Sequence, residues 1–124
     1  MILDSSFLID LMDEDAGAVA KMEELDRDRL TVPTLVYTEV GTGLDAGSPP
    51  AEAFEAMVAD VALAPYDAEA ARHAVSIQRQ LSKQGTPIGA VDAMIAGTAL
   101  ARDEAILTRN LAEFSRMPVQ PSPY

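Results

Sequence analysis

The feature that most constrains the fold of this chain is the alternation of very short apolar runs with longer helix-like segments. The apolar runs, each four or five residues long, occupy residues 1–4, 30–33, 61–65 and 105–108. Runs of this length are typical of buried strands, and parallel strands need crossover connections that are usually helical. We therefore expect an α/β fold, in which a small parallel sheet of four to five strands is flanked by helices in three layers.

Caps and breaks set the expected bounds of the helices. Ser5 and Ser6 offer caps for the first helix, and Asp67 begins the fifth. Clusters of Gly and Pro at residues 47–50 and 85–87 interrupt the helical pattern. A short helical turn and a Pro-rich tail follow the last apolar run. The expected helices occupy residues 7–12, 13–28, 34–45, 50–60, 67–83 and 88–103.

Length and residue usage limit the class of protein. A chain of 124 residues suits one compact domain over residues 1–124. The absence of Cys excludes a disulfide scaffold, a thiolate metal site and a Cys nucleophile. A single histidine, His73, excludes the paired-histidine catalysis of cyclising ribonucleases. No stretch is long and apolar enough to span a membrane, and the start lacks a basic secretory region, so we expect a soluble cytoplasmic protein.

The net charge of -11 opposes nucleic-acid binding at first sight. Phosphate contacts usually rest on Lys and Arg, and here nine basic residues stand against 20 acidic ones. The acidic residues are spread along the whole chain rather than gathered in a tail. A diffuse acidic surface that is poor in Lys indicates a protein adapted to high salt, where charge repulsion is screened. The charge therefore predicts a halophilic source and leaves the partner open.

Two acidic residues interrupt the apolar sides of expected helices. At about 100° per residue, Glu39 falls between Leu35 and Val36, on the side that we expect to face the core. Asp92 is the only charged residue between positions 88 and 101, and it falls on the apolar side of its helix. A bare buried carboxylate is costly, so each must be paired, hydrogen-bonded or bound to a cation.

A third acid, Asp4, follows three apolar residues at the end of a strand, where the ligand crevice of a parallel sheet lies. Each acid alone has a structural explanation: Asp4 can cap the first helix, Asp92 can favour a helix dipole, and Glu39 can pair with an Arg. Together they indicate a single site, because several carboxylates in one place need a hard cation to offset their repulsion. Oxygen ligands without His or Cys favour Mg²⁺ or Mn²⁺.

Four segments resemble, in order, the motifs of PIN-domain ribonucleases. Asp4–Asp10 (DSSFLID) resembles the opening motif, and Thr38–Glu39 resembles the second acidic position. Residues 87–96 (PIGAVDAMIA) and 106–114 (ILTRNLAEF) resemble the segments that carry the third acid and the closing motif. The match covers nearly the whole chain. We therefore expect a PIN-like fold, most similar to that of the VapC toxins of type II toxin–antitoxin pairs.

The resemblance assigns roles to individual acids. Asp4, Glu39 and Asp92 match the three metal-binding acids of the family, which implies Mg²⁺ or Mn²⁺ as the cofactor. Asn110 stands where many members have a fourth acid, and its amide adds no charge. Glu113, one turn further on, is the alternative fourth residue. The structural alternative is that Asn110 and Glu113 form a capping box on a short helix.

Three further residues receive roles by resemblance. Ser6 and Thr108 match hydroxyls that hold Asp4 or a water molecule. Arg109, in the closing motif, is a candidate for contact with a phosphate of the substrate, and a solvated or ion-paired role is its equal alternative. The mechanism that the family implies is in-line attack on a phosphodiester by a water whose pKa the metal lowers, leaving a 5′-phosphate and a 3′-hydroxyl.

The resemblance also implies the biological role. It predicts an endoribonuclease toxin that acts on RNA, forms a homodimer, and is silenced by a VapB-type antitoxin. The apolar faces of the helices at 7–12 and 34–45 are candidate docking surfaces, with a core role as the alternative. A housekeeping RNA-processing nuclease and a PIN-like scaffold without activity remain open. A phosphoacceptor receiver domain is disfavoured, because the strand at 61–65 ends without an Asp.

Overall fold

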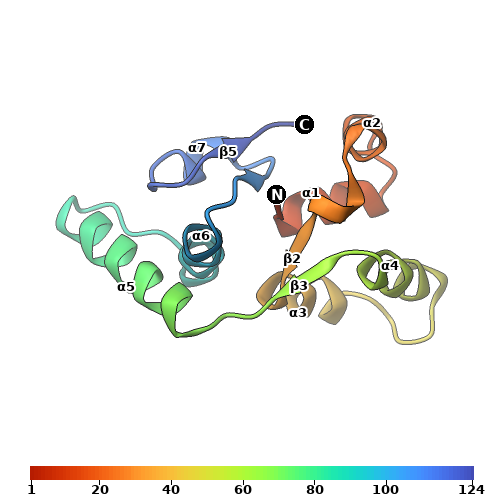
Figure 1. The fold of residues 1–124 in the computed structure, drawn as a ribbon, viewed down its shortest axis with the longest axis horizontal. Helices are drawn as coiled ribbons and strands as arrows, with labels where there is room; N and C mark the ends of the chain where they lie inside the picture. Colours follow the sequence, from red (N-terminus) through yellow and green to blue (C-terminus); the bar gives the residue numbers. More distant parts are fainter.

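A computed structural model describes residues 1–124 and contains the expected parallel sheet (Figure 1). Five strands pair in the order β3-β2-β1-β4-β5, with every neighbouring pair parallel. The first four lie inside the predicted apolar runs, and helices flank the sheet, so the α/β fold is confirmed. The strands are β1 (Ile2–Leu3), β2 (Thr31–Pro33), β3 (Ala62–Ala64), β4 (Ile106–Leu107) and β5 (Pro121–Ser122).

Strand β1 lies at the centre of the sheet, and later strands extend it in both directions. Ile2 pairs with Thr31 of β2 on one side and with Ile106 of β4 on the other. The strand order therefore reverses between β1 and β4, and ligands of parallel α/β sheets bind beyond the carboxyl ends of strands at such a point. Asp4 directly follows β1 and Thr108 directly follows β4, so both lie where the fold provides a crevice.

The fifth strand lies in the Pro-rich tail, where the sequence pattern indicated no strand. The Ile106 N–H donates to the Gln120 carbonyl at 2.9 Å, and the Thr108 N–H donates to the Ser122 carbonyl at 3.1 Å. Strand β4 supplies the N–H donors of these bonds, and β5 lies at the edge of the sheet. Pro121, which has no N–H, therefore fits in β5 without the loss of a hydrogen bond. A two-residue strand that contains Pro has no periodicity by which the sequence could reveal it.

Seven α-helices and one 3₁₀ helix connect the strands. Most follow the expected ranges, and Asp67 is the N-cap of α5, since its side chain accepts the Ala70 N–H at 2.9 Å. No helix is long and apolar enough to cross a bilayer. The helices are α1 (Ser5–Met12), α2 (Ala16–Glu24), η1 (Arg27–Arg29), α3 (Thr34–Thr42), α4 (Pro49–Ala59), α5 (Ala68–Lys83), α6 (Ala90–Arg102) and α7 (Leu111–Phe114).

The second helix departs most from its expected bounds, and the third ends at Thr42 rather than at residue 45. The helix expected over 13–28 ends at Glu24, because the Asp26 side chain accepts the Asp28 N–H at 3.0 Å and starts η1 instead. The first helix begins at Ser5 rather than at residue 7. Asp4 therefore occupies the N-cap position that Ser5 and Ser6 were expected to supply.

Helices α5 and α6 pack against each other at very close range. A Cβ atom on Gly97 of α6 would lie 2.3 Å from the Ala70 carbonyl oxygen and 3.0 Å from the Ala74 nitrogen of α5. Only Gly permits this approach, so the backbones of α5 and α6 pack in close contact at Gly97. The pair fixes the position of the first turn of α6, which carries Asp92.

Most of the apolar surface on α1 and α3 belongs to the core. Phe7 and Leu8 of α1 and Val36 and Val40 of α3 are buried in the main hydrophobic cluster. Among the large apolar residues of these two helices, Ile9 is the one that is strongly exposed, at 45%. The core role, which was the alternative to docking, therefore accounts for most of these two faces.

Candidate functional site

Asp4 is a buried carboxylate that two hydroxyl groups hold in place. Its side chain is 1% exposed, and its Oδ2 accepts hydrogen bonds from Ser6 Oγ at 2.9 Å and from Thr108 Oγ1 at 2.8 Å. Although Asp4 occupies the N-cap position of α1, its side chain makes no capping hydrogen bond. The capping explanation of Asp4 is therefore wrong, and Ser6 and Thr108 lie against it as the resemblance implied.

The two hydroxyls are in turn oriented by the backbone that follows β4. The Arg109 N–H donates to Ser6 Oγ at 3.0 Å, and the Asn110 N–H donates to Thr108 Oγ1 at 2.9 Å. Because each hydroxyl accepts a backbone N–H, its own hydrogen remains available for the carboxylate of Asp4. The ends of the two central strands are thereby linked through one carboxylate oxygen.

The other oxygen of Asp4 has no partner. Oδ1 is buried and accepts no hydrogen bond. Buried polar groups are nearly always paired, because an unpaired one retains its full desolvation cost. Of the five buried polar side chains in the protein, three belong to this cluster: Asp4, Ser6 and Thr108. A carboxylate with one oxygen fixed and the other unpaired is suited to binding a cation.

Asp92 brings a second carboxylate to this region, from the first turn of α6. Burial raises its pKa above the ordinary value, and the negative charges of Asp4, Glu113 and Glu39 raise it further. The amino end of a helix favours a charged acid, yet here burial and repulsion outweigh that effect. Three acids from other parts of the chain therefore act on Asp92.

Glu39 is exposed, which contradicts the expectation that it faces the core. The buried residues of α3 are Val36 and Val40, and Glu39 lies about 80° from the centre of the stripe that they define. None of the six ion pairs in the structure involves Glu39, so the suggested pairing with an Arg is also absent. Its charge nevertheless raises the pKa of Asp92.

The carboxyl end of the chain supplies Glu113 to the acidic group. Asn110 occupies the N-cap position of α7, but its side chain makes no capping hydrogen bond. Glu113 Oε1 accepts a hydrogen bond from Arg116 Nη1 at 3.1 Å instead of turning back to the helix start. The capping box is therefore wrong. Asn110 is exposed, whereas Glu113 is half-buried and its charge acts on Asp92.

Arg109 is ion-paired in the structure. Its Nη1 lies 2.7 Å from Oδ1 of Asp10, and Asp10 also accepts a hydrogen bond from the Tyr124 hydroxyl. Burial and the contact with Asp10 raise the pKa of Tyr124. The sequence interpretation assigned no role to Asp10. The available signal was that Asp10 is the one charged residue of α1.

The acids share a region without forming a complete coordination shell. No group of three or more acidic or histidine side chains is placed closely enough to hold one ion. The chemical type of these side chains still suits a hard divalent cation, because such cations prefer carboxylate oxygens and Oδ1 of Asp4 is unpaired. No hydrogen bond or ion pair fixes the exposed side chain of Glu39, so its carboxylate is free to change position.

Fold and site together define a class of protein: α/β domains with a short-stranded parallel sheet and an acidic site beyond its central strands. Residues 1–120 match the PIN domain family, and the chain belongs to that family. The predicted family membership is thereby confirmed.

Relatives of known structure and activity extend over nearly the whole chain. The tRNA(fMet)-specific endonuclease VapC of Shigella flexneri is 29% identical over 119 residues, covering 94% of this chain and 90% of that protein. The crystal structure of DNA-bound VapBC from Salmonella typhimurium matches with a TM-score of 0.85 and 28% identity, covering 98% of this chain and 96% of that one. VapBC-1 from nontypeable Haemophilus influenzae matches with a TM-score of 0.83 and 27% identity over the same shares.

Proposed function

We propose that this protein is a metal-dependent endoribonuclease that hydrolyses RNA phosphodiesters and acts as the toxin of a type II toxin–antitoxin pair. Membership of the PIN family and the similarity to VapC endonucleases support the nuclease activity. The observation that carries the metal dependence is the buried, unpaired Oδ1 of Asp4 beside acids whose charges raise the pKa of Asp92.

In this proposal Asp4, Glu39 and Asp92 hold Mg²⁺ or Mn²⁺. Glu113 supplies the fourth carboxylate in place of Asn110, because its charge acts on Asp92. When bound, the cation polarises the phosphodiester and activates water for in-line attack.

The chain's own groups organise this site. The hydroxyls of Ser6 and Thr108 occupy Oδ2 of Asp4 and leave Oδ1 as the ligand oxygen. The backbone after β4 keeps both hydroxyls oriented toward Asp4, so its carboxylate does not have to be reoriented when a cation binds.

The partners follow from the same similarity. The two solved relatives described above are VapBC complexes, and the one from Salmonella typhimurium is bound to DNA, which supports a VapB-type antitoxin as the protein partner. We extend the proposal to a homodimer that acts on RNA in the cytoplasm. A housekeeping nuclease of the same chemistry remains the alternative, and a VapB-type reading frame beside the gene would favour the toxin.

The proposal is tested by cleavage of end-labelled structured RNAs, initiator tRNA included, in high KCl. Cleavage with Mg²⁺ or Mn²⁺ is compared with cleavage in EDTA. Asp92→Asn is compared with Asp45→Asn, the same chemical change at an exposed position. We expect cleavage that needs the metal, that Asp92→Asn abolishes, and that Asp45→Asn preserves. Failure of the wild type to cleave any RNA, together with no effect of Mn²⁺ on its thermal stability, would contradict the proposal.

A further inference from the structure

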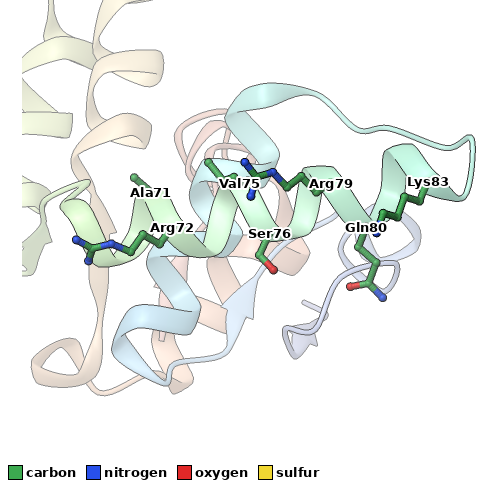
Figure 2. Close-up of a pocket in the computed structure, with 7 residues that line it drawn as sticks. All are labelled: Ala71, Arg72, Val75, Ser76, Arg79, Gln80 and Lys83. Atoms are coloured by element: carbon green, nitrogen blue, oxygen red, sulfur yellow. The ribbon is translucent and has the colours of Figure 1, made fainter.

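One face of α5 is basic, although the protein as a whole is strongly acidic. A shallow hollow on the surface is lined by residues of α5 alone (Figure 2), and we refer to the surface around it as the α5 face. Helix α5 carries three of the nine basic residues of the chain and one of the 20 acidic ones, Glu69. The residues of the α5 face are Ala71, Arg72, Val75, Ser76, Arg79, Gln80 and Lys83.

The three basic residues follow one line along the helix. At about 100° per residue, Arg72, Arg79 and Lys83 fall within about 40° of one another, and they span about 16 Å of the helix axis. All three are exposed, and Figure 2 shows them one after another along α5. They therefore form a linear array of positive charge and not a single cationic point.

None of these three side chains is neutralised by an acid. Five of the other six basic side chains are ion-paired, and Arg29 is the remaining free one. Acidic residues outnumber basic ones by more than two to one, so a basic side chain readily finds an acidic partner on this surface. Three adjacent free cations thus produce a local positive field where the rest of the protein repels anions.

We propose that the α5 face binds the phosphate backbone of the RNA substrate. This inference rests on the proposed nuclease function, which requires that an acidic protein hold a polyanion. Apart from Arg29, the α5 face carries every basic side chain that is not already paired. A linear array of cations matches a strand that bears one phosphate per nucleotide.

The α5 face also leads toward the acidic site. Lys83 ends α5, and residues 84–89 connect it directly to α6, whose first turn carries Asp92. The Arg116 guanidinium donates to the Thr86 carbonyl and so ties this connection to the segment after α7. An RNA strand bound along α5 would therefore extend toward the end of the α5–α6 pair at which Asp92 lies.

The test is the salt dependence of RNA binding. Binding of a fluorescein-labelled oligouridylate of about 12 nucleotides is followed by anisotropy in EDTA, from about 50 mM to about 400 mM KCl. Three phosphate contacts with a single strand give a slope of log affinity against log salt of about −2. The variant R72Q/R79Q/K83Q should lose this slope and bind about 100-fold more weakly near 0.1 M KCl. Gln keeps a high helix propensity, and circular dichroism checks the fold.

A matched control removes the same number of charges elsewhere. The variant K21Q/R27Q/R29Q changes α2 and η1 and should keep the wild-type slope. If the α5 variant keeps the wild-type slope, or if the control loses as much, the inference is overturned. It is also overturned if the α5 variant stops binding poly-L-glutamate but still binds RNA, because the face then recognises an acidic protein segment.

Cleavage in the presence of metal separates this inference from the function on which it rests. A wild type that cleaves RNA, but whose binding does not depend on the α5 face, overturns the inference alone. A wild type that neither binds nor cleaves RNA overturns the proposed function together with the inference.

Discussion

Replacing Thr108 with Val tests the construction of the site, because one hydroxyl connects three of its parts. Thr108 Oγ1 donates to Asp4 Oδ2 at 2.8 Å, accepts the Asn110 N–H at 2.9 Å, and lies 3.3 Å from Ser6 Oγ. The side chain of Thr108 is 0% exposed, so water has no access to replace the lost group. Val keeps the branched shape and removes only the hydroxyl.

The expected cost follows from the bonds lost. A hydrogen bond to a charged group contributes about 1.5–3 kcal/mol, and the Asn110 N–H loses its hydroxyl acceptor at the same time. Thr108→Val should therefore lower the free energy of unfolding by about 2–3 kcal/mol, which is about 10 °C in Tm for a domain of this size.

Thr98→Val is the matched control. Thr98 is 1% exposed, and its hydroxyl makes one hydrogen bond, to the neutral Met94 carbonyl at 2.9 Å. Its loss should cost less than about 1 kcal/mol. Urea unfolding followed by circular dichroism measures both variants in EDTA. Equal costs for the two substitutions would refute the argument that Thr108 supports a buried charge.

Two other substitutions test the acids and the helix pair. Asp92→Asn should stabilise the protein in EDTA at about pH 7, because burial and three neighbouring acids raise the pKa of Asp92. A carboxyl with a raised folded pKa costs stability as the pH rises through that pKa, so the advantage of Asn should shrink toward the ordinary Asp value of 3.8. Thermal unfolding over this pH range measures it, and an advantage independent of pH contradicts the explanation. Gly97→Ala places a Cβ 2.3 Å from the Ala70 carbonyl and should cost about 1–3 kcal/mol in urea unfolding, even though Ala favours a helix. A Gly97→Ala variant more stable than the wild type would show that α5 and α6 separate easily.

Much of the fold could be predicted because the apolar runs of short strands and the first residues of helices are visible in a few neighbouring residues of the sequence. The apolar runs located four strands, and Asp67 marked the start of α5 to within one residue. Strand β5 escaped prediction because its pairing with β4 is set by distant residues and not by its own sequence. The helix expected over 13–28 was predicted to be longer than it is. The hydrogen bond from the Asp28 N–H to the Asp26 side chain, which starts η1 instead, does not affect the hydrophobic periodicity from which the helix was predicted.

The acids of the site could be found because they interrupt apolar patterns, but their surroundings could not be predicted. Glu39 lies beside the buried stripe of α3 without entering it, a distinction that depends on which neighbours cover the helix. The Asp10–Arg109 pair joins residues that are distant in sequence. Their meeting follows from the adjacency of β1 and β4, which the short strands do not specify.

The central claim is that Asp4 and Asp92 hold a divalent cation, and Mn²⁺ located in a crystal tests it most directly. Crystals soaked in MnCl₂ and measured above and below the manganese absorption edge reveal the ion by its anomalous scattering. The claim predicts a peak within about 2.3 Å of Asp4 Oδ1 and also in contact with an oxygen of Asp92. A peak elsewhere, or none beside Asp4 in crystals that bind Mn²⁺ at other sites, would contradict it.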